Sequence, residues 1–174
     1  MKFLVISTSA NPDSNSRRMG QLAYESLKKT GVDVDWLDTR ELNLPMCDAD
    51  TCYADPSVNT FAAAIKSADG ILIAAPVYNY DVSAAAKNMI ELTGNAWEDK
   101  IVGFLCAAGG HGSYMSVMAY ANSLMLDFHC VIIPRFAFAT SHAFEGDRIN
   151  DTKTNARIHH VADELIRFTK ALRA

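Results

Sequence analysis

The sequence predicts an α/β protein, a three-layer sandwich with helices on both faces of a five-stranded parallel sheet. Short apolar runs alternate with segments of helical period from one end of the chain to the other. Of the 174 residues, 49% are apolar and 21% are charged, which suits a globular chain with a sizeable core. The sequence has no repeat, linker or low-complexity tract, so we expect one domain over residues 1–174.

The first elements along the chain are a strand, a helix and a second strand. Phe3–Ser7 is apolar enough for a buried strand, and a polar loop over Thr8–Asn15 leads into the helix. The helix has one apolar stripe, formed by Met19, Leu22, Ala23, Ser26 and Leu27. Gly31, just past its end, is a favourable left-handed cap. In Val32–Asp38 apolar residues alternate with aspartates, so this strand has one wet face and belongs at a sheet edge.

The middle of the chain begins with an irregular loop. Leu42–Ser57 contains two prolines and no clear period, whereas Val58–Ala68 has the spacing of a helix. Gly70–Ala75 is wholly apolar and predicts a buried strand. We expect this strand to end at Pro76, which fixes φ and shapes a stiff turn.

The last elements continue the alternation of helix and strand. Ser83–Thr93 predicts a helix with Ser83 as its N-cap, and Ile101–Ala107 predicts another buried strand. Ser113–Asp127 is helical and Cys130–Ile133 is a short strand. Asn155–Leu172 forms a final helix with its apolar residues in register.

Crossover connections between parallel strands are right-handed, and this rule favours the order 2-1-3-4-5 for the five strands. The wet second strand then lies at an edge, and the first and third strands are neighbours. In open α/β sheets, ligands bind outside the carboxyl ends of the strands, where the strand order reverses. The loops after strands one, three and four are therefore the candidate binding loops.

The first of these loops, Ser7–Arg17, contains no glycine, which excludes a GxGxxG pyrophosphate loop and a P-loop. It is rich in Ser and Asn at the start of a helix, where backbone N–H groups and the helix dipole favour a phosphate. Neutral donors suit a terminal monophosphate held without a strong cationic clamp. The alternative is a serine-rich capping turn, because Ser and Asn are also preferred N-caps.

The other two loops supply a flat aromatic surface and an exposed backbone. Pro76–Asp81 carries two tyrosines around an asparagine, suited to a planar heteroaromatic ring, although a surface turn packed on its own sheet would look the same. Ala107–Ser113 contains three glycines, which let the backbone approach a ligand closely, as a merely flexible turn also would. The three polar loops fall at one sheet edge, and this coincidence favours a shared ligand.

These motifs resemble those of the NAD(P)H-dependent FMN reductase family of flavodoxin-like proteins, over nearly the whole chain. Ser9–Ser16 is similar to the family's phosphate loop, S-x-R-x-x-S-x-[ST]. Pro76–Tyr80, followed by Lys87-Asn88, is similar to its P-x-Y-N-x…K-N signature, the most specific match. Ala108-Gly109-Gly110 resembles its third flavin loop. The resemblance implies a flavodoxin-like fold, FMN as the cofactor and NADPH or NADH as the electron donor.

The resemblance also implies a set of FMN-binding residues. Those expected at the phosphate are Ser9, Asn11, Ser14, Asn15 and Ser16. Those expected to line the isoalloxazine ring are Pro76, Val77, Tyr78, Asn79 and Tyr80, with Ala108, Gly109, Gly110 and His111 of the third loop at its rim. No catalytic acid–base triad is expected, since the cofactor supplies the chemistry.

Asn11 departs from the family motif, in which many members carry arginine. The change removes a positive charge near the phosphate, and we expect Arg17 to compensate in part. At most a modest preference for NADPH over NADH follows.

The function implied by the resemblance is that of an FMN-dependent oxidoreductase. Electrons would pass from NADH or NADPH through the flavin to a small acceptor such as a quinone, a free flavin, a metal oxyanion, or an azo or nitro compound. One open face of the flavin predicts a ping-pong mechanism. There are three alternatives. The first is an electron-carrier flavodoxin, which usually has a T-x-T-G-x-T loop and a more acidic surface. The second is a receiver domain, which needs a phosphorylatable Asp where this chain has Pro76, and the third is a non-catalytic interaction protein.

Charge and cysteine usage bear on partners and location. The net charge of −4 and the pI near 5.7 argue against nucleic acid and anionic membrane surfaces as partners. No apolar run is long enough for a secretory h-region or a bilayer span. Cys47 and Cys52 are expected to be plain thiols rather than a metal or redox pair, and His159-His160 point apart on a helix, so no metal site is expected. We therefore expect a cytoplasmic protein.

The helix over Ser113–Asp127 is apolar on more than one face, although a core helix needs only one apolar stripe. Its large apolar residues are Met115, Met118, Leu124, Met125 and Leu126. We expect the surplus face to be covered in a homodimer or a dimer of dimers, beside the flavin.

Overall fold

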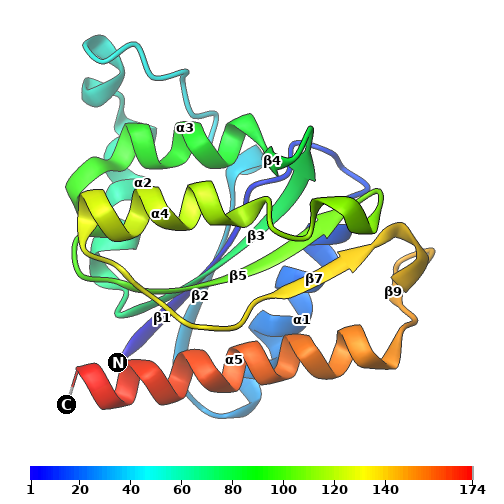
Figure 1. Cartoon of the computed structure of the whole chain (residues 1–174). Coiled ribbons are helices and arrows are strands. Elements are labelled where there is room, and N and C mark those ends of the chain that lie inside the picture. The colour runs from blue at the N-terminus through cyan, green and yellow to red at the C-terminus, as the bar shows by residue number, and fades with distance from the viewer. Residues whose placement is uncertain (174) are drawn as a thin grey trace.

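Helices pack on both faces of a mostly parallel sheet in the computed structural model, which describes residues 1–173 (Figure 1). The parallel strands are β1 (Lys2–Ser7), β2 (Asp33–Asp38), β3 (Gly70–Tyr78), β5 (Ile101–Ala108), β6 (Val131–Ile132) and β7 (Ala137–Thr140). One face is covered by α1 (Asn15–Lys29) and α5 (Thr152–Leu172). The other is covered by α2 (Pro56–Ser67), α3 (Ala84–Thr93) and α4 (Val117–Phe128).

The strand order is β2-β1-β3-β5-β6, which confirms the predicted flavodoxin-like order 2-1-3-4-5. The aspartate-bearing β2 lies at an edge as expected; its first four residues alternate between exposed and partly buried, and Asp38 at its end is buried. By contrast, β1, β3 and β5 are buried along nearly their whole length, because helices cover both of their faces. Their carboxyl ends meet at one edge of the sheet (Figure 1).

The fifth strand differs from the prediction, because it is split into two. Val131 and Ile132 pair with the first residues of β5, and β7 pairs with its last four residues, Ala108 lying opposite Thr140. Pro134 stands between the two segments and has no N–H group to donate, so the ladder is interrupted there. The predicted strand Cys130–Ile133 is thus too long, and β7 was missed.

The third strand also departs from the prediction, since it does not end at Pro76. It continues to Tyr78 and returns as the short antiparallel strand β4 (Asp81–Val82). The reversal lies at Asn79 and Tyr80, whose φ values of 50° and 65° are those of a two-residue type I′ turn. The register with β5 continues through Pro76, which lies opposite Ala107 although it has no N–H group to donate.

Three helices begin at residues other than the predicted ones, whereas Ser83 and Gly31 lie at helix ends as predicted. The helix α2 starts two residues earlier than predicted, because Asp55 caps it, and α5 starts three residues earlier, because the Asp151 carboxylate accepts the Thr154 N–H at 2.7 Å. The helix α4 starts at Val117 rather than Ser113, after a short 3-10 turn over His111–Ser113. Ser83 caps α3 as predicted, and Gly31 has a φ of 80°.

Two hydrophobic cores lie on the two sides of the sheet. The core beneath α2, α3 and α4 holds the fully buried Trp97 and Phe61, and the core beneath α1 and α5 holds Phe3 and Met19. The sheet is thus held rigidly from both faces, and the loops at its carboxyl edge are presented on a fixed frame.

Candidate functional site

The loops after β1, β3 and β5 surround one cavity of about 320 Å³ at the carboxyl edge of the sheet, here called the carboxyl-edge cavity. Ten of the fourteen predicted FMN-binding residues line it: Ser9, Asn11, Ser14, Asn15, Ser16, Pro76, Val77, Tyr78, Ala108 and Gly109. Asn79, Tyr80, Gly110 and His111 lie outside this lining. The topology therefore brings together three segments that are far apart in the sequence.

Three lining residues were not predicted: Asp13, Ala107 and Ser141. Asp13 lies within the phosphate loop, and its carboxylate is paired with the Arg18 guanidinium, which also binds Asp147. Ser141 follows β7, and the large–small alternation of residues 136–139 was the signal that could have revealed this strand.

The first loop is organised by hydrogen bonds within itself. The hydroxyl of Ser14 accepts the Arg17 N–H at 3.2 Å as the N-cap of α1, and it lies 3.0 Å from the hydroxyl of Ser16. The Asn11 side chain accepts the Asp13 N–H at 2.9 Å. Both serine side chains are almost wholly buried at the N-terminus of a fifteen-residue helix. Hydroxyls and N–H groups at such a helix end form a site for an anion.

Arg17 does not replace the missing arginine of the motif, contrary to the expectation from the sequence. Its side chain is buried and does not line the cavity; its Nε lies 2.5 Å from the Asp38 carboxylate at the end of β2. The same guanidinium donates to the carbonyl oxygens of Ser9 and Asn11, both at 2.6 Å, and of Pro12 at 3.2 Å. Arg17 therefore holds the loop in shape through its carbonyl groups, as a positioning residue.

The first and second loops are tied together by Ser83. Its hydroxyl donates to the carbonyl of Thr8 at 3.1 Å, and its N–H donates to the carbonyl of Pro76 at 3.1 Å. Thr8 in turn donates its N–H to the carbonyl of Ala74 at 3.0 Å. These bonds fix the first loop, with the anion site at the start of α1, relative to the second loop, which begins at Pro76.

Asn88, from the second half of the signature, acts outside the cavity. Its side-chain amide donates to the Pro45 carbonyl at 2.8 Å, and its oxygen accepts the Cys47 N–H at 2.8 Å. It thereby fastens the irregular loop after β2 to α3. The neighbouring Lys87 forms an ion pair with Glu91 on the same helix at 2.7 Å.

The third loop contributes open backbone at Gly109 and Gly110. A Cβ atom placed on either residue would meet no atom within 4 Å, so nothing in the protein fills the space beside them. At Gly112 a Cβ would lie 3.1 Å from the hydroxyl oxygen of Tyr80, which shows that the second and third loops touch. His111 faces a neighbouring pocket instead of the carboxyl-edge cavity.

The residues of the carboxyl-edge cavity fit FMN by the chemistry of their donors. Hydroxyl and amide groups surround the N-terminus of α1, which suits a phosphate monoester. Pro76, Val77 and Tyr78 of the second loop line the same cavity as Ala108 and Gly109 of the third, and their apolar surfaces suit a planar ring. A lining that combines hydroxyl and amide donors with apolar surfaces matches a ring linked to a terminal phosphate.

Replacing Ser16 by alanine is expected to weaken FMN binding by about 1.5 kcal/mol, roughly tenfold, because a hydrogen bond to a charged group is lost. Riboflavin has no phosphate, so its affinity should stay unchanged. Calorimetric titration of both flavins measures this, with Ser67→Ala at the end of α2 as the control. Equal losses for FMN and riboflavin would show that Ser16 acts through the fold of the loop.

The cysteines and histidines outside this cavity form no second cluster in the described part of the chain. No group of three or more His, Cys, Asp or Glu there could hold a metal ion. All four cysteines are free; the Cys47 and Cys52 sulfurs lie 3.9 Å apart. Burial raises the pKa of Cys106 to about 12 and that of Cys130 to about 11. These two thiols are thus unreactive core residues.

Within residues 1–173, none of the helices combines the length and the apolar character that crossing a bilayer requires.

Comparison with known proteins adds to this geometry. A family model described as NADPH-dependent FMN reductase matches residues 1–145. An Arabidopsis thaliana protein named NADPH:quinone oxidoreductase is 30% identical over 151 residues, which cover 82% of this chain and 77% of that protein. An Escherichia coli protein named FMN reductase (NADPH) is 31% identical over 121 residues, covering 67% of this chain and 62% of that protein.

Among solved structures, a flavoenzyme NAD(P)H:acceptor oxidoreductase from Paracoccus denitrificans has the same fold. The two structures superimpose with a TM-score of 0.77 at 19% identity, over 98% of this chain and 97% of the other.

Proposed function

Since the chain belongs to the NADPH-dependent FMN reductase family, and is thus an oxidoreductase that works with FMN and a nicotinamide donor, we propose that it passes electrons from NADPH or NADH to a small acceptor by a ping-pong mechanism. The acceptor class includes quinones, free flavins, metal oxyanions, and azo and nitro compounds. The observation that supports this most is the meeting of ten predicted FMN-binding residues around one cavity.

The protein's part in this reaction is to bind and orient. When bound, FMN supplies the redox chemistry, taking electrons from a nicotinamide and giving them to an acceptor. Ser9, Ser14 and Ser16 would hold its phosphate, with Arg17 keeping the loop in shape behind them. The wall from Pro76 to Tyr78 would fix the plane of the ring.

The ping-pong order is supported by how open the second loop is. Tyr78, which lines the cavity, is 51% exposed, so this side of the cavity is open to solvent. A ring held there has one accessible face, and donor and acceptor must use it in turn. Because the open side of the cavity places little constraint on the shape of an acceptor, we expect the protein to reduce a broad range of acceptors.

Stopped-flow mixing of the FMN-loaded protein with NADPH or NADH, without any acceptor, tests this function. We expect the flavin absorbance to bleach within seconds and to return when a quinone is added. An ordered mechanism would instead require the acceptor for bleaching. If neither nucleotide reduces the flavin but a reduced partner protein does, the chain is an electron carrier.

We also propose that a second copy of the chain covers the methionine face, defined as Met115, Met118, Met125 and Leu126. These four side chains are exposed on and just before α4, whereas Leu124 points into the core. Met115 and Met118 lie near the third loop at the start of α4, and Met125 and Leu126 lie in its last turn. A two-fold homodimer, or a dimer of dimers, would bury it.

Leu126→Glu is expected to convert this homodimer to a monomer at micromolar concentration, because the dimer would have to bury an unpaired charge. Light scattering measures the mass, and Leu172→Glu on α5 is the matched control. Wild-type protein that is already monomeric would refute the homodimer.

A cytoplasmic location completes the proposal. It is supported by the four free thiols, since an oxidising compartment would favour disulfides. Cell fractionation with an antibody to the chain tests it.

A further inference from the structure

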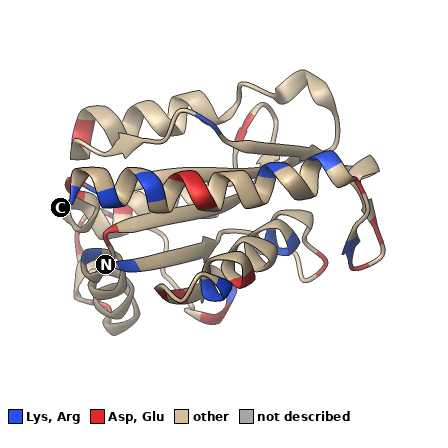
Figure 2. Ribbon diagram, turned by 90° about the horizontal axis from the view of Figure 1, so that it is seen from below, with Lys and Arg blue, Asp and Glu red and all other residues tan. Residues whose placement is uncertain are grey.

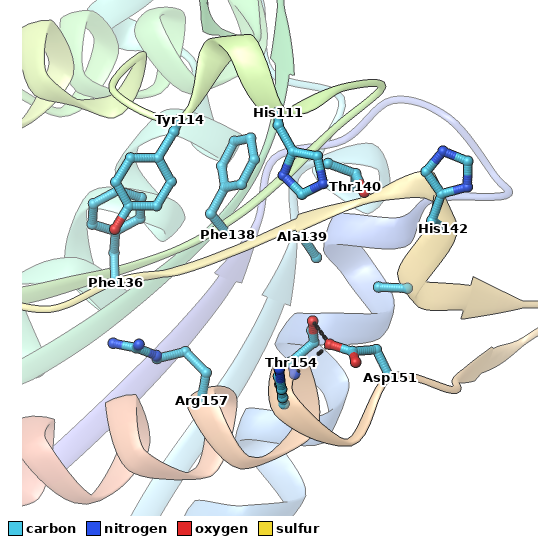
Figure 3. A pocket seen from close by; sticks show the side chains of 12 residues that line it. His111, Tyr114, Phe136, Phe138, Ala139, Thr140, His142, Asp151, Thr154 and Arg157 are labelled. Carbon is cyan, nitrogen blue, oxygen red and sulfur yellow. Dashed lines mark hydrogen bonds between the residues drawn. The ribbon is translucent and has the colours of Figure 1, made fainter.

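A second pocket, of about 440 Å³, lies beside the carboxyl-edge cavity along the free side of β7 and is here called the β7 pocket. Figure 3 shows Phe136, Phe138, Tyr114 and His111 on one side of it and Arg157 and Asp151 of the α5 region on the other. Its volume is in the range of small-molecule sites, about 300–1,000 Å³. Nothing in the function described so far uses it.

One wall of the β7 pocket is a cluster of three aromatic side chains. The ring of Tyr114 lies 4.9 Å from that of Phe136 and 5.4 Å from that of Phe138, between centroids, with interplanar angles of 32° and 74°. Tyr114 is nevertheless 49% exposed, so half of its surface is free. A partly open aromatic cluster is a surface on which a planar heteroaromatic ring can stack.

The opposite wall is cationic. Lys153 and Arg157 are four residues apart on α5, so they lie on the same face of the helix, and Figure 2 shows basic residues along this helix, including near its N-terminal end. Both side chains are exposed, and within the described residues neither forms an ion pair. Two positive charges without an ion-pair partner at the rim of a pocket favour a phosphate dianion.

The one acid in the lining, Asp151, forms no ion pair with either cation within the described residues. Its carboxylate accepts the hydroxyl of Thr154 at 2.6 Å and its N–H at 2.7 Å, as the cap of α5. These hydrogen bonds, and more weakly the charge of Lys153, lower the pKa of Asp151, so the carboxylate stays ionised and offsets only part of the positive charge. The imidazoles of His111 and His142 add further donors at the mouth.

The β7 pocket and the carboxyl-edge cavity are neighbours. Ala107 and Ala108 line the cavity, and their partners in the ladder, Ala139 and Thr140, line the pocket. Along the chain, Ser141 lines the cavity while the next residue lines the pocket. The two sites thus share the wall formed by the ends of β5 and β7.

We propose that the β7 pocket binds the 2′-phosphoadenosine half of NADPH, with the adenine against Tyr114 and Phe138 and the 2′-phosphate near Lys153 and Arg157. This rests on the proposed function, in which NADPH reduces the flavin held in the carboxyl-edge cavity. The donor's nicotinamide end would then lie across the shared wall. NADPH is preferred over NADH because of these two cations, not because of the residue at position 11.

Fragment binding tests the pocket without any flavin chemistry. Calorimetry with 2′,5′-ADP and with 5′-AMP should show 2′,5′-ADP binding about tenfold tighter, and Arg157→Ala or Lys153→Ala should remove most of that difference. Arg167→Ala, on the same helix and paired with Glu164, is the matched control and should change nothing. Equal affinities for the two fragments would overturn the proposal, as would inorganic phosphate binding as tightly as 2′,5′-ADP.

Steady-state kinetics give the second readout. Arg157→Ala should raise KM for NADPH about tenfold while KM for NADH and the affinity for FMN stay unchanged. Equal rises for both nucleotides would overturn the assignment of the 2′-phosphate. If neither nucleotide reduces the flavin while the fragments still discriminate, the proposed function fails and the assignment of the pocket holds.

Discussion

Replacing Arg17 with methionine is expected to lower the free energy of unfolding by about 3–5 kcal/mol, the usual cost of breaking a buried ion pair by removing one partner. The substitution leaves the buried Asp38 carboxylate without its 2.5 Å partner. It also leaves the carbonyls of Ser9 and Asn11 without their donor. The first loop then keeps the hydrogen bonds of Ser14 and Asn11 but loses the guanidinium that holds its carbonyl groups.

FMN binding should weaken at least a hundredfold in the same variant. An unanchored loop must be ordered when the phosphate binds, and ordering even two residues of backbone costs about 2–4 kcal/mol. Thermal unfolding of the apoprotein and calorimetric titration with FMN measure the two effects. Arg17→Lys keeps the charge but not the fork of donors, so it should recover only part of either loss.

The control is Arg40→Ala, because Arg40 approaches the same Asp38 carboxylate at 3.6 Å but makes no bond to the first loop. It should leave FMN affinity unchanged. If Arg17→Met weakens FMN binding while the apoprotein melts as the wild type does, Arg17 touches the phosphate directly and the positioning role is wrong.

The fold could be predicted because its main signals are local. The apolar runs of β1, β3 and β5 mark strands covered on both faces, and the alternating aspartates of β2 mark an edge. Handedness and connection rules then leave few ways to order the strands. The cap at Ser83 was also visible, because a serine there directly precedes a helical period, whereas Ser14 was expected at the phosphate and caps α1 in the structure.

What the sequence did not reveal depends on contacts between distant segments. The role of Arg17 follows from Asp38, twenty-one residues away, and from carbonyl groups that no side-chain pattern encodes. The β7 pocket is built from the turn before α4, the strand β7 and the start of α5, of which β7 was missed and α5 was placed too late. Each segment alone shows only ordinary aromatic or basic residues.

Gly109→Trp is expected to weaken FMN binding while leaving the fold intact. Gly109 lines the carboxyl-edge cavity, and a Cβ there would meet no protein atom within 4 Å. An indole at this position therefore enters space that the apoprotein leaves open, and its folding stability should not change. In the complex the same indole must compete with the flavin for a cavity of about 320 Å³. Such overpacking costs about 1–3 kcal/mol, so FMN should bind roughly ten- to a hundredfold more weakly.

The decisive measurement pairs two readouts on one variant: the flavin absorbance of the purified protein and the melting temperature of the apoprotein. Asn95→Trp places the same side chain on an exposed turn after α3, away from the carboxyl-edge cavity, and should keep both at wild-type values. If Gly109→Trp melts like the wild type and still carries as much FMN as the wild type, the flavin does not lie against Gly109. The place of the third loop at the rim of the ring would then have to be abandoned, because the indole would have met no ligand there.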